Sequence, residues 1–223
     1  MALPNVPHRI GRVNSGDVSI FYRAFGTRGA TPQAPFEQRV AERVTSADPT
    51  VRAIQAQRAL SYLPQRPNFH PHLTCAEIMG FYAQLRGIAL SRGQAMLDQI
   101  GLREFDRVRI GELSGGTRQR LGLALLLLPD APVLLLDEPG LSLDPTWRKR
   151  LQETLRFEAA RGKTVLVTTH LVAEWNNVAH RCLLCCDGKI ERELDPRNLP
   201  HNFDEMKTLA TSLTYEPHFS VLH

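Results

Sequence analysis

Two short runs of consecutive apolar residues dominate the hydrophobic pattern of the chain, and each ends in polar residues. The first is "PVLLLDEP", residues 132–139, and the second is "KTVLVTTH", residues 163–170. An apolar run of this length predicts a strand that is buried on both faces of a parallel sheet. A shorter alternating stretch, "RALSYLPQ", leads into a proline-bounded loop and predicts a further strand.

Helix signals lie between this alternating stretch and the first apolar run. Thr74 and Glu77 have the spacing of a capping box, which predicts a helix that begins there and ends near Gly87. A second helix is expected through "SRGQAMLDQIG", closed by Gly101. Together the two helices predict a small helical lobe.

Further helices are predicted around the two apolar runs. Ser114 precedes two glycines as the cap of a helix through "TRQRLGLALLLL", and Asp144 with Pro145 opens another helix that stops at Gly162. We expect "LVAEWNNVAH" to form the next helix and "RCLLCCDGKIERE" a hairpin that turns at its Asp-Gly pair. This alternation of strands and helices predicts an α/β fold with a mostly parallel sheet core and a helical lobe.

Composition narrows the class of protein without identifying it. The 223 residues suffice for one full-sized domain, and the net charge of +4 is spread among acids rather than gathered in a nucleic-acid-binding stripe. The N-terminus has no apolar stretch as long as that of a signal peptide. No part of the sequence has the roughly 18 uninterrupted apolar residues of a membrane span. The sequence therefore predicts a cytoplasmic chain that binds no nucleic acid.

Two groups of cysteine and histidine side chains could bind a metal, but their sequence context favours other roles. Cys182 and Cys185 have a C-x-x-C spacing, but no second ligand pair accompanies them, so buried thiols in a strand are the default. His70 and His72 lie two apart in a proline-rich loop, where surface histidines are expected. Metal binding stays open as the less favoured alternative for both groups.

Acidic residues and a histidine end the two apolar runs. Asp137 and Glu138 close the first run and His170 closes the second. Because parallel strands end at one shared edge, where α/β proteins bind ligands, we expect these side chains to lie together. An aspartate there can hold Mg²⁺, and the adjacent glutamate can orient or deprotonate an attacking water. Taken singly, Asp137 and Glu138 would be an ordinary solvated strand end, and His170 would be a structural histidine with its hydrogen bonds satisfied.

The stretch "LSGG", residues 113–116, has the pattern of a phosphate-binding turn at a helix start. Ser114 caps the helix, and Gly115 and Gly116 leave bare backbone N–H groups that an oxyanion can approach. The helix behind them adds about half a positive charge at its N-terminus. This predicts a binding site for a phosphate group.

The series "YLPQ", "LSGGTRQR", "VLLLDEP", "LSLDP" and "VTTH" resembles, in this order, the motifs of the ATP-binding cassette ATPases. The resemblance covers residues 58–193 and favours cassettes of bacterial multidrug, haem and copper-processing exporters. It implies a P-loop NTPase-like core, with ATP and Mg²⁺ as cofactors and Asp137 and Gln65 at the metal. The implied roles are Gln65 as the Q-loop glutamine, Leu113, Ser114, Gly115 and Gly116 as the signature turn, Asp137 as the Walker B aspartate, Glu138 as the catalytic glutamate, Asp144 as the D-loop aspartate and His170 as the switch histidine.

The chain departs from this family at the phosphate-binding loop (Walker A). The family places that loop near residues 15–30, where "SGDVSIFYRAFGTRGATP" stands without G-K-[ST], and the first lysine of the chain is Lys149. The segment weakly resembles the opening strands of α/β-hydrolases, but no G-x-S-x-G nucleophile elbow follows, which disfavours a serine hydrolase. A natural fusion or truncation would also account for the unusual segment.

The sequence thus divides into an atypical segment 1–57, a cassette body 58–193 and a tail 194–223. Within the body, residues 66–112 are expected to form the helical lobe and 113–193 the core. The resemblance implies the ATP-binding subunit of a transporter, peripheral to the inner membrane, that partners membrane-spanning subunits and a second cassette with an intact phosphate loop. The alternative is a non-catalytic or regulatory cassette, or a fragment, that lends its signature turn to a partner's ATP site.

Overall fold

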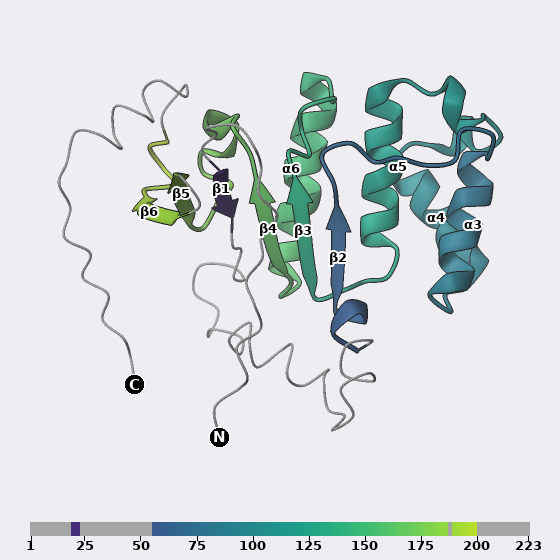
Figure 1. The fold of residues 1–223 in the computed structure, drawn as a ribbon, viewed down its shortest axis with the longest axis horizontal. Coiled ribbons are helices and arrows are strands. Elements are labelled where there is room, and N and C mark those ends of the chain that lie inside the picture. The colour runs from purple at the N-terminus through teal and green to yellow at the C-terminus, as the bar shows by residue number, and fades with distance from the viewer. Residues whose placement is uncertain (1–18, 23–54, 187–188, 200–223) are drawn as a thin grey trace.

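The computed structural model describes residues 19–22, 55–186 and 189–199 (Figure 1). Helices and strands alternate along most of this part of the chain, which confirms the predicted α/β class. The strands are β1 (Ser19–Tyr22), β2 (Leu60–Leu63), β3 (Val133–Asp137), β4 (Thr164–Thr168), β5 (Cys182–Cys186) and β6 (Lys189–Leu194). The helices are α3 (Cys75–Leu85), α4 (Leu90–Gln99), α5 (Gly115–Leu127) and α6 (Pro145–Ala160), with 3₁₀ turns η1 (Arg103–Phe105), η2 (Ile110–Glu112) and η3 (Val172–Trp175).

Two three-stranded sheets organise the described residues. The strands β2, β3 and β4 are parallel, with β3 in the middle, and their register pairs Leu63 with Leu136 and Asp137 with Thr168. The second sheet is antiparallel in the order β1-β5-β6. Figure 1 shows α3 and α4 beyond α5 on one side of the parallel sheet, and β1, β5 and β6 on the other side.

The core lies between the parallel sheet and the helices α5 and α6. Alternate strand residues are almost fully buried and belong to one cluster with apolar residues of these helices, namely Leu134, Leu136, Val165 and Val167. Burying one such side chain contributes about 1.5–3 kcal/mol relative to leaving it exposed. The apolar runs that predicted the strands therefore hold the sheet against α5 and α6.

Side-chain caps start α3, α5 and α6 where the sequence predicts. At α3, the Thr74 hydroxyl accepts a hydrogen bond from the Glu77 N–H at 3.2 Å, and the Glu77 carboxylate accepts one from the Thr74 N–H at 2.8 Å. Ser114 caps α5, and Asp144 caps α6 with Pro145 in its first turn. The glycines that were expected to stop α3, α4 and α6 all have positive φ angles.

The helix predicted through residues 171–180 is wrong. Only the 3₁₀ turn η3 forms, because tertiary hydrogen bonds draw the backbone away beyond Trp175. The Asn176 side-chain oxygen accepts from the Leu199 N–H at 2.9 Å, and the Asn177 N–H donates to the Pro196 carbonyl at 3.0 Å. Asn177 takes a positive φ of 59°, which asparagine tolerates better than most residues.

Some sequence predictions fall outside the described residues. The absence of a phosphate loop in residues 1–60 can be compared only with β1 and residues 55–60, and the hairpin turn at 187–188 and residues 200–223 are not described. The strand β1 lies within "SGDVSIFYRAFGTRGATP", the segment that resembles the opening strands of α/β-hydrolases, and pairs with β5. The hairpin strands β5 and β6 pair as predicted.

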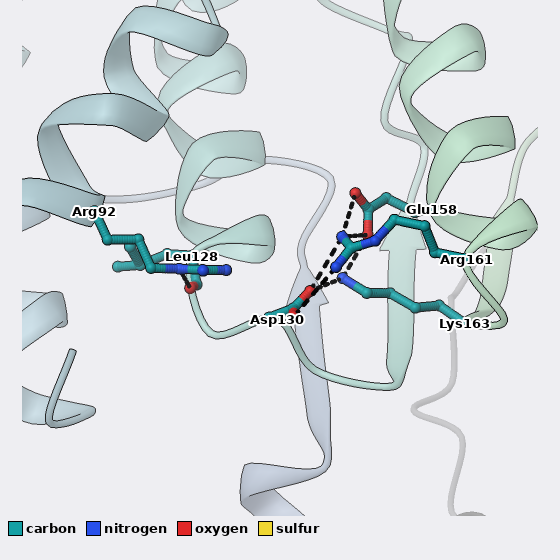
Figure 2. Close-up of polar contacts among 6 residues, drawn as sticks. All are labelled: Arg92, Leu128, Asp130, Glu158, Arg161 and Lys163. Atoms are coloured by element: carbon teal, nitrogen blue, oxygen red, sulfur yellow. Dashed lines mark hydrogen bonds and ion pairs between the residues drawn. The ribbon is translucent and has the colours of Figure 1, made fainter. Parts of the chain in front are cut away.

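A cluster of charged side chains closes the edge of the sheet where β3 and β4 begin (Figure 2). Glu158 and Lys163 are buried and form an ion pair, and the Lys163 ammonium also lies 2.6 Å from Asp130. Arg161 contacts both acids, at 3.1 Å from Glu158 and 3.3 Å from Asp130. Burial alone would raise the pKa of Asp130, but Lys163 and Arg161 together hold it below its ordinary value.

Removing the buried cation should destabilise the fold. We expect Lys163→Ala to lower the free energy of unfolding by about 3 kcal/mol, because it leaves Glu158 buried with Arg161 as its only cation in the cluster. The exposed pair of Arg103 with Asp98 is the control, and Arg103→Ala should cost less than about 1 kcal/mol. Urea unfolding of both variants measures the difference, and equal costs would contradict a structural role for the cluster.

Candidate functional site

The start of α5 presents free backbone N–H groups. Ser114 has an extended backbone, and its hydroxyl accepts a hydrogen bond from the Thr117 N–H at 3.1 Å. The N–H groups of Gly115 and Gly116 precede that bond, and the first turn of a helix leaves such donors without partners inside the helix. The arrangement therefore suits an anion, since the helix dipole adds partial positive charge at this end.

The two glycines of this turn have different surroundings. A Cβ atom added at Gly116 would lie 2.8 Å from the carbonyl oxygen of Ser142, whereas one added at Gly115 would meet no atom within 4 Å. About one turn later on α5, the buried Gln119 contacts the same loop, because its side-chain amide donates a hydrogen bond to the Pro139 carbonyl at 3.3 Å. The helix start is thus packed against the loop of residues 139–144, while Gly115 faces open space.

That loop begins directly after the acidic end of β3. The hydroxyl of Thr168, on the neighbouring strand β4, donates a hydrogen bond to the Asp137 carboxylate. The Glu138 N–H donates to the Thr168 carbonyl at 3.0 Å, and Glu138 takes a positive φ of 45°. A positive φ is uncommon for glutamate and turns its side chain away from the direction that a continuing strand would give it.

Glu138 and His170 are in direct contact, as their shared sheet edge predicts. One carboxylate oxygen of Glu138 accepts a hydrogen bond from the His170 N–H at 2.9 Å and lies 2.8 Å from the His170 Nδ1 atom. The other oxygen is buried and has no hydrogen-bond partner. A buried carboxylate oxygen without a partner can accept a proton or a hydrogen bond from a water molecule, which is the property that a general base needs.

The remaining predicted site residues lie around this edge. Asp144 caps α6 by accepting a hydrogen bond from the Trp147 N–H at 3.0 Å, and Gln65 is exposed two residues beyond the end of β2. Leu113 differs, because its side chain is buried and its N–H donates to the Ile110 carbonyl. Leu113 therefore anchors the turn in the core, and the anion-facing groups begin with Ser114.

Comparison with known proteins agrees with this geometry. Residues 36–140 match the family model of ABC transporters. The Nod factor export ATP-binding protein I of Burkholderia thailandensis is 37% identical over 154 residues, which make up 66% of this chain and 50% of that protein. These similarities support an ATP-binding cassette ATPase. The uncharacterized ABC transporter ATP-binding protein YxlF of Bacillus subtilis is also 37% identical, over 60% of this chain and 46% of its own length.

The cassette spans about half the length of the curated relatives it matches. Solved structures agree on the fold. The chain is similar to the ATP-binding subunit of an ABC transporter with a TM-score of 0.64, 16% identity and coverage of 87% of this chain and 99% of that one. It is also similar to the dimeric, post-hydrolysis ATP-binding cassette MJ0796 bound to ADP and Pi, with a TM-score of 0.59, 27% identity and 70% coverage of both chains. The P-loop NTPase-like fold class is confirmed.

Metal chemistry based on cysteine has no support in the described part of the cassette. No three His, Cys, Asp or Glu side chains of that part gather as a metal cluster would require. Burial raises the pKa of the Cys182 thiol to about 12, so this sulfur stays protonated at neutral pH. Among the helices that the structure describes, none is long and apolar enough to cross a membrane.

Sequence reasoning missed several residues that shape the site. Gln119 and Thr168 hold the acidic loop in place through contacts with Pro139 and Asp137, and Ser142 sets the limit on the side chain at Gly116. Gln119 has no sequence signal of its own, because it stands between Arg118 and Arg120 in the polar first half of α5. Such a position indicates a buried hydrogen bond only after the packing of the helix is known.

The two glycines of the turn should respond oppositely to the same substitution. Gly116→Ala should lower the free energy of unfolding by about 1–3 kcal/mol, because the added methyl group overlaps a backbone carbonyl. Gly115→Ala should be neutral or raise it by up to about 1 kcal/mol, because the space is open and alanine favours a helix. Thermal unfolding of both variants tests the contact, and equal shifts would show that α5 does not pack on Ser142.

Proposed function

We propose that this cassette is the ATP-binding subunit of a membrane transporter and that it lends its signature turn, Leu113–Gly116, to ATP held by a second cassette. The observation that carries the proposal is the start of α5, where the N–H groups of Gly115 and Gly116 lie in the first turn of the helix and the space beside the Gly115 Cα atom is open. A helix start of this kind attracts phosphate without needing a lysine. Because the segment near residues 15–30, where the family places its phosphate loop, contains no G-K-[ST] and no lysine precedes Lys149, we infer that the lysine-bearing phosphate loop comes from a partner.

The same reasoning limits what the cassette does alone. A phosphate loop supplies several backbone donors and a cation to the β- and γ-phosphates. Glu138 and His170 act only on phosphate that other groups hold in place, however well they contact each other. Glu138 and His170 therefore belong to a nucleotide site that this chain, by our proposal, cannot fill with ATP on its own. This is the physical basis for preferring a partner-completing subunit to a self-sufficient ATPase.

ATP and Mg²⁺ are the proposed cofactors. Asp137 ends β3, and Gln65 lies two residues beyond the end of the neighbouring strand β2. These two side chains would hold the metal, which would neutralise phosphate charge. One carboxylate and one amide oxygen fall short of the six ligands that Mg²⁺ prefers, so they fit the ion only if phosphate oxygens and water complete the shell. The donors of this chain thus fit a magnesium–nucleotide complex better than a free ion.

A cavity beside β2 supports docking to membrane-spanning subunits. Its volume is about 200 Å³, and it lies between β2, the loop after Gln65, α3 and α5, lined among others by Leu63, Phe69, Tyr82 and Leu125. Phe81, the neighbour of the lining residue Tyr82 on α3, has an exposed side chain. We infer that an apolar side chain of a membrane subunit fills this cavity, which would place the cassette at the inner face of the membrane.

The proposal predicts trans-complementation of ATP hydrolysis. A suitable partner is the MJ0796 cassette with its own signature turn inactivated, so that its homodimer is silent. Neither protein alone should hydrolyse ATP above background, whereas the mixture should. Loss of one preorganised donor from an anionic transition state costs on the order of 10²–10³ in rate, so the missing loop should silence the pure chain.

Two variants identify which groups work in the mixture. Gly115→Glu should abolish the rescued activity, since it places a carboxylate at the phosphate site without a clash inside the chain. Glu138→Gln should change it less than about threefold, because the composite site uses the glutamate of the partner. Robust hydrolysis by the pure chain that Glu138→Gln removes would contradict the proposal.

A further inference from the structure

The side chain of Arg120 joins three helices next to the signature turn. It lies on α5, and its Nε and Nη2 atoms donate hydrogen bonds to the Ile100 carbonyl at 3.3 and 3.0 Å. The Nη2 atom also donates to the Gly101 carbonyl. Both acceptors follow the last turn of α4, where helix carbonyls lack partners and carry partial negative charge. Arg120 therefore ties the end of α4 to the first half of α5.

The other face of the same guanidinium stacks on α6. Its carbon atom lies 3.9 Å from the centre of the Trp147 ring, and the guanidinium carbon of Arg150 lies 4.9 Å from that centre. Stacking of arginine on tryptophan is a favourable cation–π contact that strengthens as water is excluded. Burial lowers the pKa of Arg120, but an arginine remains charged at any physiological pH.

Two of these three helices, α5 and α6, carry a predicted nucleotide-facing group at their start. Ser114 caps α5, and Asp144 caps α6 by accepting from the N–H of Trp147, the residue on which Arg120 stacks. Gly101 permits this arrangement, since a Cβ atom there would lie 3.0 Å from Arg120 Nη2 and 3.3 Å from the Trp147 ring. One side chain thus links the supports of Ser114 and Asp144.

We propose that Arg120 is a positioning residue that fixes the starts of α5 and α6 relative to each other, so that Ser114 and Asp144 meet a nucleotide as one unit. The benefit of this unit for ATP rests on the proposed function, but the coupling itself is a property of the free chain. A lysine would keep the charge while losing the planar face that stacks and the paired donors. Arg120→Lys is therefore the informative change.

A second arginine provides a matched control. Arg92 lies on α4, and its Nε atom donates to the Leu128 carbonyl at 3.0 Å, at the far end of α5 (Figure 2). It makes the same kind of bond between the same two helices, away from the signature turn. If guanidinium–carbonyl bonds here only stabilise the fold, Arg92→Lys and Arg120→Lys should behave alike.

Amide hydrogen exchange of the free chain tests the coupling directly. Arg120→Lys should speed exchange at the amides of Thr117 and Trp147 together, by about tenfold, because both caps loosen when the stack and its hydrogen bonds are lost. Arg92→Lys should leave both amides unchanged. If Arg120→Lys leaves them unchanged, or speeds them no more than the core amide of Val165, Arg120 is only a structural contact and the proposal is overturned.

The consequence for assembly is measured separately. With ATP, Mg²⁺ and the signature-inactivated MJ0796 cassette, sedimentation should show that Arg120→Lys needs about tenfold more protein to assemble than the parent chain, as expected for a lost cation–π contact and its hydrogen bonds. Equal assembly of the two would overturn the role of Arg120 toward the nucleotide. Failure of the parent chain to assemble would count against the proposed function, and the exchange experiment would still decide the coupling.

Discussion

The N-terminus of α5 can lie against the loop of residues 139–144 only because Gly116 has no side chain. The Ser142 carbonyl occupies the place that a Cβ atom would take, and the Gln119 amide holds the Pro139 carbonyl one turn farther along. This contact sets the distance between the signature turn and the loop that begins at Glu138. The positions of Glu138, Asp144 and the free N–H groups of α5 all follow from it.

The parallel sheet supplies the other half of the arrangement. Since Asp137 pairs with Thr168, the residues that follow β3 and β4 leave the sheet side by side, and Glu138 meets His170. The far edge is closed by the buried pair of Glu158 and Lys163, so the sheet is anchored where its strands begin. The buried Glu138 oxygen that has no partner therefore lies at the opposite edge, where a ligand can satisfy it.

Much of this could be predicted from the sequence, because caps and apolar runs are local signals. Ser114 and Asp144 were predicted as helix caps from their own neighbours, and the contact of Glu138 with His170 followed from the shared edge of parallel strands. The helix expected after His170 failed, because its fate depends on hydrogen bonds of Asn176 and Asn177 to residues about twenty positions away.

The contacts that position the site belong to the same non-local class. Nothing in "LSGGTRQR" shows that Gly116 faces a carbonyl while Gly115 faces open space. Nor does it show that Arg120 stacks on the distant Trp147. These are properties of packing between helices, and a linear pattern carries no trace of which faces meet. The sequence does show directly that no lysine precedes Lys149, and this makes a partner necessary in our account.

Equilibrium binding of ATP tests the central claim most directly. Radiolabelled ATP with Mg²⁺ would be titrated into the purified chain alone and into its mixture with the signature-inactivated cassette. The account predicts no saturable binding to the pure chain below about 1 mM, and retention of ATP by the mixture that Gly115→Glu removes. Micromolar binding to the pure chain that Asp137→Asn weakens would contradict the account, because the chain would then hold nucleotide in its own site.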